Sequence, residues 1–425
     1  MTQEATRTDP TTEDLPLFPL PRAERCPFDP PPAYEEFRED SGVTRMRLWN
    51  DQTAYLITRA EYFRALLNDP RVSAVRSNPD MPKTSPMAAA NLPTRTSFRA
   101  MDGDEHRRLR RMVTRDFSMP NVEASKEEIT RICNDLIDEM IAKGPTADVI
   151  ADYAFGLPTQ LFCHILGVPA EDRAFFETEV ARMFSRSSDQ ATAEAAGKAL
   201  LGYFKEFIEV VGEEEPRNDI VSRLVHQQYK KGNIDLVDLL NTLVLLIGGG
   251  FDTTGNGIGS SVHLLLQHPD QLALLRDTED QALVERSVEH LLRYLPVIDS
   301  GLDRVVIDDI ELDGHVFRKG DGLVFNVPAS NRDPRDFEDP DSVDLTKEAP
   351  AHVAFGYGPH QCLGQNLARA ELQIAIPLLL RRLPGLAHAV PAEEVKWRFD
   401  RQIVGLDELP VTWDQEAAVA LQQQR

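Results

Sequence analysis

Residues 235–267 form the longest helical pattern in the sequence, and this stretch limits the folds that the chain can adopt. At about 1.5 Å per residue, some thirty residues span roughly 45–50 Å, which is enough to cross a whole domain. The middle of the stretch contains Gly248, Gly249 and Gly250, and each glycine weakens a helix by ~1 kcal/mol relative to alanine. A helix tolerates such residues where a ligand comes close or where its hydrogen-bond ladder opens. The sequence therefore predicts a domain-crossing helix that meets a ligand near its middle.

The composition is that of a globular protein, since 42% of the 425 residues are apolar and 27% are charged. Acidic residues outnumber basic ones by 69 to 46, and the net charge of −23 argues against nucleic acid or an anionic membrane as partner. No apolar run reaches the ~18–20 residues that cross a bilayer. Residues 1–14 resemble neither a signal peptide nor an anchor, and we expect a disordered lead-in there. Four cysteines without a CxxC pair fit a reducing cytoplasm, with Cys133 and Cys163 in the core.

Cys362 lies in the glycine-rich loop Phe355–Gly364, directly before an apolar helical pattern. Glycine permits positive φ and a close approach of the backbone to a flat ligand. A loop that delivers a thiolate to a metal needs both properties, and its N–H groups can bond the sulfur and tune its electron donation. A cysteine thiolate below an iron porphyrin favours O–O cleavage. The alternative is a buried cysteine beside a glycine turn.

This loop matches, position by position, the haem-binding loop of the cytochrome P450 family: Phe, Gly, any, Gly, any, His, any, Cys, any, Gly. The resemblance covers roughly residues 15–413, leaves 414–425 as a loose tail, and makes the chain similar to the soluble bacterial haem-thiolate monooxygenases. It implies one catalytic domain, mainly α with a small β-rich lobe, shaped as a triangular prism with the long helix crossing the haem. It also implies haem b as cofactor, Cys362 as the axial ligand of the iron, and haem contacts from Phe355, Gly358, His360 and Gly364.

Residues 249–253 match the family's distal motif, which reads small-Gly-any-acid-Thr. In the family the acid and the threonine manage proton delivery to bound dioxygen, so the resemblance makes Asp252 and Thr253 the catalytic residues. Splitting dioxygen to give water consumes protons in a dry pocket, which explains the need for such a pair. Gly249 and Gly250 would let the cofactor approach the helix. The alternative is a polar pair that satisfies its own backbone.

His106 and Arg110 lie four residues apart and therefore share one face of a helix. Two such donors suit an anionic group, and haem carries two propionates. The resemblance assigns them to the propionates together with Arg304 and His360. The alternative is a solvated basic helix face, because residues 107–115 include five arginines.

The resemblance implies a small, largely apolar organic substrate, such as a secondary metabolite, that reacts with O2. Residues 73–100 show little periodicity and contain four prolines. The corresponding region covers the substrate in the family, whereas the alternative is a mobile loop. The expected substrate contacts come from this loop, the long helix and two later segments, and they are Met87, Leu92, Phe98, Phe251, Val297, Ile298 and Ile403.

Two positions of the family's buried Glu-Arg-Arg triad are changed. Arg293 is present, but His290 replaces the glutamate and Ser342 replaces the second arginine. Removing both members of a buried charge pair can be nearly neutral, whereas removing one leaves an unbalanced charge. We therefore expect a less charged network that still supports haem binding, in which Arg293 bonds a neutral His290 ring or backbone carbonyls. The alternative is that Glu289 pairs with Arg293 after a local shift of the helix.

The sequence contains no recognisable flavin or iron–sulfur module, so the resemblance implies electrons from NAD(P)H through a separate ferredoxin reductase and ferredoxin. Arginines of residues 107–115 that do not bind haem would suit an acidic partner, and ordinary surface charge is the alternative. Two other functions are compatible with the sequence. One is a nitric-oxide-reducing haem-thiolate enzyme that takes hydride directly from NAD(P)H, although Asp252 speaks against it. The other is a non-catalytic haem-binding relative, which the altered triad suggests.

Overall fold

The computed structural model describes residues 12–21, 29–84, 97–184, 190–298, 302–349, 351–398 and 403–424. The helices are α1 (Ala33–Asp40), α2 (Ala60–Leu67), α4 (Gly103–Thr114), α5 (Met119–Lys143), α6 (Gly156–Leu166), α7 (Arg173–Phe184), α8 (Gln190–Glu213), α9 (Ile220–Leu224), α10 (Leu236–Leu266), α11 (Pro269–Asp277), α12 (Gln281–Tyr294), α13 (Val327–Ser330), α14 (Gln365–Arg382) and α15 (Gln415–Gln423). The strands are β1 (Val43–Arg47), β2 (Thr53–Ile57), β3 (Val72–Ser73), β4 (Thr146–Asp148), β5 (Asp303–Val306), β6 (Ile310–Leu312), β7 (His315–Phe317), β8 (Gly322–Phe325), β9 (Ala387–His388), β10 (Trp397–Arg398), β11 (Gly405–Leu406) and β12 (Pro410–Thr412). The prediction of a mainly α fold with a small β-rich lobe is confirmed.

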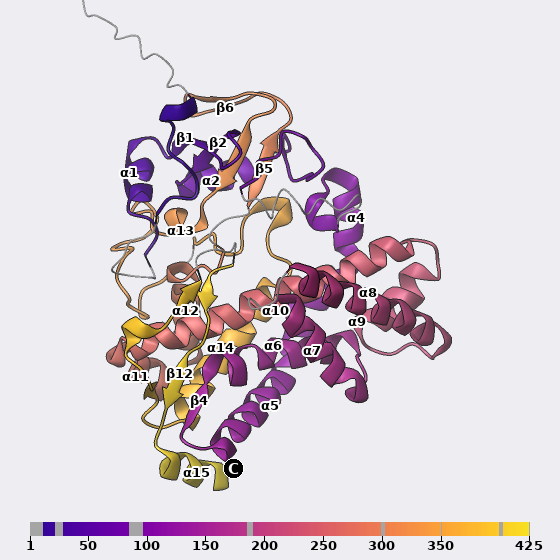
Figure 1. Cartoon of the computed structure of the whole chain (residues 1–425), viewed down its shortest axis with the longest axis vertical. Helices are drawn as coiled ribbons and strands as arrows, with labels where there is room; N and C mark the ends of the chain where they lie inside the picture. The colour runs from indigo at the N-terminus through magenta and orange to yellow at the C-terminus, as the bar shows by residue number, and fades with distance from the viewer. Residues whose placement is uncertain are drawn as a thin grey trace, which may run out of the picture.

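Helix α10 is the central helix that the sequence predicts, and it differs from the expected stretch by one residue at each end. The carboxylate of Asp235 caps it by accepting a 2.8 Å hydrogen bond from the Asp238 N–H. Figure 1 shows α10 running through the helical part of the molecule, where it packs against α6, α14 and β11. Every residue from 254 to 265 is buried. Among the described residues, α10 is the one helix whose length and composition would allow a membrane crossing, and 39% of its most apolar window is buried inside the protein.

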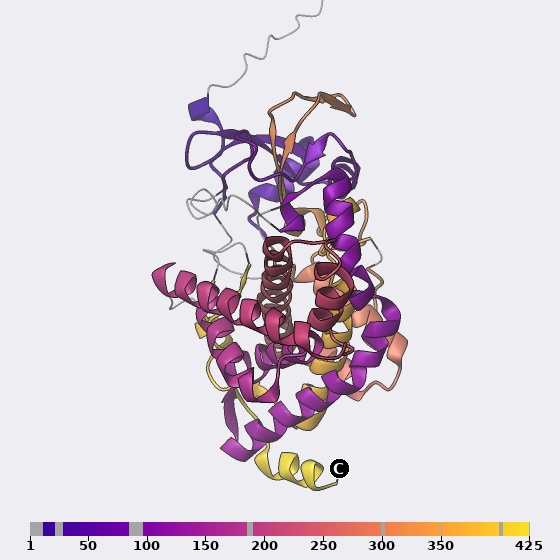
Figure 2. The ribbon, with the colours of Figure 1, turned by 90° about the vertical axis from the view of Figure 1, so that its right-hand side faces the viewer.

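The β-rich lobe joins two segments that lie far apart in the sequence. Its five-stranded sheet has the order β1-β2-β8-β5-β3, with β2 and β8 parallel and the other pairs antiparallel. The lobe has its own apolar core, in which the rings of Phe63 and Phe325 meet edge to face at 5.3 Å. Figures 1 and 2 both place this lobe at one end of the long axis, opposite α15.

The chain end is more ordered than the expected tail over residues 414–425. Residues Gln415–Gln423 form α15, whose first turn is capped by Asp414 through a 3.0 Å bond from the Ala417 N–H. The Gln415 side chain donates to the carbonyl of Ile141 at 2.8 Å, and Ala418 is fully buried. Tertiary contacts with α5 and α14 therefore stabilise a helix that its glutamine-rich sequence does not indicate by itself.

Candidate active site

The Cys362 loop lies directly against α2, and a glycine at position 358 makes this close contact possible. Gly358, in the short 3-10 helix η7 (Gly358–His360), has a φ of +70°, and a Cβ built there would lie 2.5 Å from the carbonyl oxygen of Leu67. A side chain at this position would therefore be strained and would also collide with α2. The Cys362 N–H closes the loop with a 2.8 Å hydrogen bond to the Phe355 carbonyl.

The Cys362 thiol retains accessible surface although protein atoms surround it. Burial raises the pKa of the thiol above its usual value, and the Gly364 N–H together with Arg110 acts in the opposite direction because these groups favour the thiolate. Cys362 is thus exposed in the loop although nearby protein atoms desolvate its thiol. This position allows the sulfur to reach a bound metal, with a backbone donor directed at it.

Helix α4 brings His106 and Arg110, two of the predicted propionate-binding residues, to the Cys362 loop. The rings of His106 and His360 lie 4.1 Å apart, and Arg110 donates to the carbonyl of Gln361 at 2.5 Å. His106 is 2% exposed, and its Nε2 has no hydrogen-bond partner among the described residues. Burial, followed by the nearby His360 and Arg110, lowers the pKa of His106 to about 4. An unpartnered, neutral imidazole nitrogen in this position fits a ligand that accepts a hydrogen bond.

Arg304 adds positive charge from the sheet side. Its side chain lies on β5 and is 8% exposed, and it bonds the carbonyl of Asp303 at 2.8 Å. Burial lowers the pKa of Arg304 to about 10; the charge of Asp303 acts in the opposite direction, and neighbouring Arg76 and Arg99 add to the lowering. Asp303 is itself buried, and burial raises the pKa of its carboxyl group. Arginines therefore outnumber ionised acids here, as an anionic ligand requires. An accessible thiol, an unpartnered histidine and excess positive charge together fit an iron porphyrin with carboxylate substituents.

The acid and alcohol of α10 have different partners. The Thr253 hydroxyl donates to the Gly249 carbonyl at 2.7 Å, so it bonds its own backbone, as the structural alternative for this residue expects. Asp252 instead accepts a 2.7 Å hydrogen bond from the side chain of Asn256. Asn256 in turn accepts a 2.6 Å bond from Arg398. Asp252 and Thr253 both retain partial exposure, which leaves each side chain accessible to a ligand.

The glycines of the distal motif differ in what they approach. A Cβ on Gly249 would meet nothing within 4 Å, which leaves this face open for a ligand. A Cβ on Gly250 would lie 2.0 Å from the Phe162 ring of α6, so the space at Gly250 serves the packing of two helices. The expected substrate contact Phe251 is buried in the core, 5.0 Å from the ring of Phe155. The structure gives Gly250 and Phe251 packing roles that the motif alone does not indicate.

Three of the expected substrate contacts come together. Ile298 and Ile403 form an antiparallel bridge, and the N–H of Val404 donates to the carbonyl of Val297 at 2.8 Å. Of the others, Phe98 is buried in the short helix η2 (Phe98–Ala100), 6.2 Å from the His106 ring. Met87 and Leu92 lie outside the described residues.

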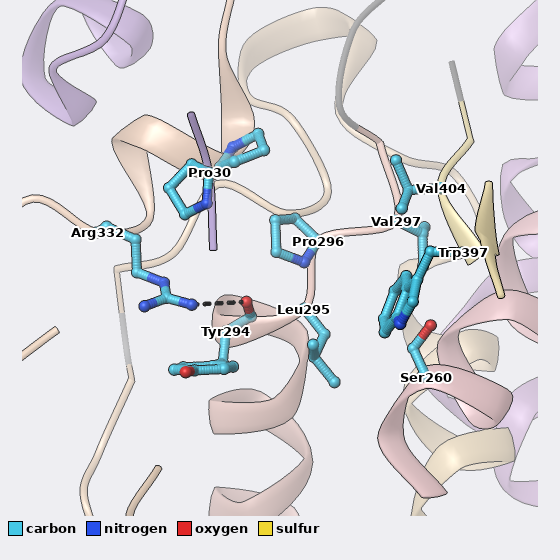
Figure 3. Close-up of a pocket in the computed structure, with 10 residues that line it drawn as sticks. Pro30, Ser260, Tyr294, Leu295, Pro296, Val297, Arg332, Trp397 and Val404 are labelled. Carbon is cyan, nitrogen blue, oxygen red and sulfur yellow. Dashed lines mark hydrogen bonds between the residues drawn. The ribbon is translucent and has the colours of Figure 1, made fainter. Parts of the chain in front are cut away.

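Figure 3 shows a pocket beside the bridged segments, with Val297, Val404 and Trp397 on one side and Arg332 on the other. The cavity itself is small, about 30 Å³, and it is open to solvent on one side. Val297 therefore belongs to a wall that is accessible from outside. The lining is largely apolar, as expected for contacts with an organic molecule.

Sequence reasoning missed Asn256 and Arg398. Asn256 lies four residues after Asp252 on the same helix face, so the spacing alone could have indicated their contact. Arg398 has no comparable local signal, because it reaches Asn256 from β10, 142 residues further along the chain.

The altered triad is replaced by a network of neutral acceptors. Arg293 donates to the carbonyls of Asn331 and Pro340 at 3.0 and 2.7 Å, and its guanidinium carbon lies 5.1 Å from the centre of the Phe337 ring. The contact from Arg293 to the His290 ring is longer, at 3.5 Å. Burial, followed by Arg293, lowers the pKa of His290 to about 3, so the ring is neutral. The expected less charged network is therefore present.

Glu289 is not the substitute partner of Arg293. Its carboxylate binds both nitrogens of Arg369 at 2.6 and 2.9 Å and accepts from His352 at 2.9 Å. Because Arg369 lies on α14, Glu289 thus links α12 to the helix that directly follows the Cys362 loop.

Comparison with known proteins agrees with this arrangement. Cytochrome P450 is the family that matches, over residues 33–392. The chain is 39% identical over 409 residues to "Vitamin D3 dihydroxylase" of Streptomyces griseolus, with 96% of this chain and 99% of that protein covered. It is 38% identical to "Pentalenic acid synthase" of Streptomyces avermitilis, with 96% and 100% covered. The crystal structure of GfsF superposes with a TM-score of 0.90 at 39% identity, covering 94% of this chain and 100% of that one.

A second solved structure, the mycinamicin VIII C21 methyl hydroxylase MycCI of Micromonospora griseorubida, matches with a TM-score of 0.84 at 35% identity, covering 94% of this chain and 100% of that one. These similarities extend over nearly the whole length of each protein, so they concern the complete catalytic fold. The chain belongs to the cytochrome P450 family and is a haem-dependent monooxygenase of the bacterial type.

Proposed function

We propose that this P450 hydroxylates or otherwise oxidises a largely apolar secondary metabolite, with haem b as its cofactor. The observation that carries the proposal is the exposed Cys362, in a loop that His106 and Arg110 of α4 contact at His360 and Gln361. The substrate class is supported by the relatives, whose names mention vitamin D3, pentalenic acid and a mycaminosyltylactone.

The arginines and histidines around the loop would hold the cofactor. Cys362 would ligate the iron, while His106, Arg110, Arg304 and His360 would bind the propionates. The unpartnered Nε2 of His106 supplies a donor that no described residue uses. When bound, the haem with its thiolate ligand supplies the activation of O2. Phe355, Gly358 and Gly364 shape the loop so that backbone donors reach the sulfur.

Asp252 and Thr253 would hold and transfer protons above the cofactor. A carboxylate accepts and returns protons readily, whereas a hydroxyl can pass one on while keeping one of its own. Thr253 is hydrogen-bonded to Gly249, so its hydroxyl oxygen still has lone pairs for a further partner. Gly249 keeps this side of α10 open.

The substrate would lie against the wall formed by Val297, Ile298 and Ile403, with Phe98 near the propionate end. These side chains offer apolar contact area and no charge, so they favour a hydrocarbon framework over a polar metabolite.

Electrons would come from NAD(P)H through a ferredoxin reductase and a ferredoxin in the cytoplasm. The exposed arginines of α4 and the turn that follows it lie beside the Cys362 loop, because Arg110 of the same helix contacts Gln361. Arg107 pairs with Asp104, and Arg108 bonds the Asn233 carbonyl at 2.6 Å. Arg111 and Arg115 are therefore the better candidates for docking an acidic partner.

The decisive experiment is a carbon monoxide difference spectrum of the reduced, haem-loaded protein. A Soret band shifted far to the red indicates an intact thiolate ligand, and the matched variant Cys362→His should give the band of a histidine-ligated haem. A wild-type spectrum of the histidine-ligated kind would contradict the assignment. Turnover of vitamin D3 with a surrogate ferredoxin and reductase then tests the substrate class. Consumption of NADH with nitric oxide and no ferredoxin would instead favour the nitric-oxide-reducing alternative.

A further inference from the structure

A chain of two side-chain hydrogen bonds joins Asp252 to a strand near the end of the sequence. Asn256 Nδ2 donates to Asp252 Oδ1 at 2.7 Å, and Arg398 Nη2 donates to Asn256 Oδ1 at 2.6 Å. The guanidinium can only donate, so the amide oxygen of Asn256 must face Arg398 and its NH2 group must face Asp252. The same Nδ2 also donates to the backbone carbonyl of Asp252 at 2.6 Å, so the orientation of the amide is set from both sides, by this carbonyl and by Arg398.

These residues lie in the interior, where such bonds are strong. Asn256 is 0% exposed and Arg398 is 9% exposed. The outer side of Arg398 faces Asp407, whose Oδ1 lies 3.5 Å from Arg398 Nε and whose side chain is 48% exposed. The cation is thus largely desolvated, and an oriented amide transmits its effect to the carboxylate in a medium of low dielectric constant.

The backbone at Gly405 leaves just enough space for the Asn256 side chain to reach Arg398. Arg398 and Gly405 are direct partners in the β10–β11 ladder, and β11 packs against α10. A Cβ built on Gly405 would lie 1.8 Å from Asn256 Oδ1 and 2.4 Å from its Cγ. Glycine at 405 therefore admits the Asn256 side chain to the space beside Arg398. The contact between Asn256 and Arg398 therefore depends on three elements, α10, β10 and β11.

We propose that Arg398 is a positioning residue for Asp252, acting through Asn256. It holds the Asp252 carboxylate toward the β10–β11 hairpin and offsets its negative charge. This inference rests on the proposed function, in which Asp252 handles protons above the cofactor. Without Arg398 the Asn256 oxygen loses its cationic donor, and the amide is held by the Asp252 backbone carbonyl and carboxylate. The donor that Asn256 presents to the carboxylate is then less firmly positioned and less polarised.

A double-mutant cycle on the ferric, haem-loaded protein tests the link without any substrate. Urea midpoints are measured for the wild type, Asp252→Asn, Arg398→Met and the double variant. We expect the double variant to lose less than the sum of the single losses, and we expect the losses to add when Asn256→Ala is present throughout. Gly405→Ala, which changes no charge, should abolish the coupling as Asn256→Ala does. Asp407→Asn, which alters the outer contact alone, should leave most of the coupling.

Two further readouts separate positioning from a general loss of stability. In a crystal structure of the haem-loaded Arg398→Met protein, the Asp252 carboxylate should have turned away from Asn256. Arg398→Lys keeps the cation and should restore part of the coupling. Additive losses in the cycle, or an unchanged Asp252 rotamer, would overturn the proposal.

The closing measurement is the share of NADPH electrons released as hydrogen peroxide with surrogate redox partners. It should rise in Arg398→Met and in Asp252→Asn, and the double variant should resemble Asp252→Asn. If Asp252→Asn raises the peroxide share while the cycle is additive, the positioning role is wrong and the proposed function stands. If the cycle is coupled but Asp252→Asn leaves the share unchanged, the role given to Asp252 in the proposed function is wrong.

Discussion

Replacing His290 by glutamine should make the protein markedly less sensitive to acid. His290 is 2% exposed, and burial followed by the positive charge of Arg293 lowers its pKa from 6.5 to about 3. The unfolded chain therefore binds a proton at this residue more readily than the folded chain does. Stability associated with the neutral ring is fully present above the unfolded-state pKa, and it is lost as the pH falls from there toward the folded-state pKa.

The size of the effect follows from the two pKa values. At about pH 5, the unfolded state gains a factor of roughly 30 from protonation of His290 and the folded state gains almost nothing, which corresponds to about 2 kcal/mol. The assay is urea unfolding of the ferric haem-loaded protein, followed by tryptophan fluorescence at about pH 7.5 and about pH 5. His290→Gln should lose about 2 kcal/mol less than the wild type between these conditions.

The matched control for this prediction is His164→Gln, which removes a largely exposed histidine of α6. His164→Gln should keep more of the acid sensitivity of the wild type than His290→Gln does, because it leaves the buried His290 in place. His106 and His263 have pKa values lowered to about 4, so they steepen the wild-type profile in the same direction and cancel in the comparison. The reasoning is refuted if the two variants lose equal stability on acidification, because His290 would then titrate normally in the folded protein.

Three further predictions concern Glu371, Gly358 and the C-terminal helix α15. Glu371 is 1% exposed, and burial raises its pKa to about 8, so the stability linked to its protonated form should be lost as the pH rises from about 4.5 through 8. Glu371→Gln should remove roughly 3 kcal/mol of that loss at pH 7. Urea unfolding measures the effect, with the exposed Glu209→Gln as control. Gly358→Ala should lower the free energy of unfolding by ~2 kcal/mol or more and lower haem occupancy, because its Cβ would meet Leu67. The control Gly356→Ala has a similar φ of +71° and nothing within 4 Å of its Cβ, so it should cost only the backbone strain of ~1–2 kcal/mol. Equal losses of stability in the two variants would contradict the contact with Leu67. Deleting residues 415–425 should lower stability by about 1 kcal/mol, because Ala418 and the Gln415 contact with α5 are lost; an unchanged urea midpoint would show that α15 contributes nothing.

Local signals explain which parts of the fold could be predicted. Helix α10 begins at a capping aspartate and ends before His268-Pro269, and both signals lie in the immediate sequence, so its ends could be predicted to within a residue. The pairing of β1 with β2 is likewise local, because only a short turn separates the two strands. Helix α15 has a good cap at Asp414 but no strong apolar face, and its stability depends on α5 and α14, which the local sequence does not contain.

The same distinction applies to the site. The contacts of Cys362, His106 and Arg110 follow from short motifs and helical spacing, and the structure brings these residues together at one loop. The pairing of Glu289 with Arg369 instead depends on how α12 packs on α14. The link from Asn256 to Arg398 depends on the register of β10 and β11. Distances between elements of this kind are set by the assembled core, and a linear pattern does not encode them residue by residue.

The hydrogen-bond acceptors of Arg293 affect which substitutions and insertions this protein can tolerate. Two of its acceptors are backbone carbonyls, at Asn331 and Pro340, and every amino acid carries a carbonyl. Substitutions at residues 338–342 can therefore accumulate without removing these acceptors, provided the loop keeps its path. Insertions or deletions there would move the carbonyls and leave a buried cation without acceptors. In libraries built on this scaffold, the segment should accept a single length and many sequences, except at Asp341, which pairs with the buried Arg332 at 2.5 Å, and at Asp339, whose φ is +49°.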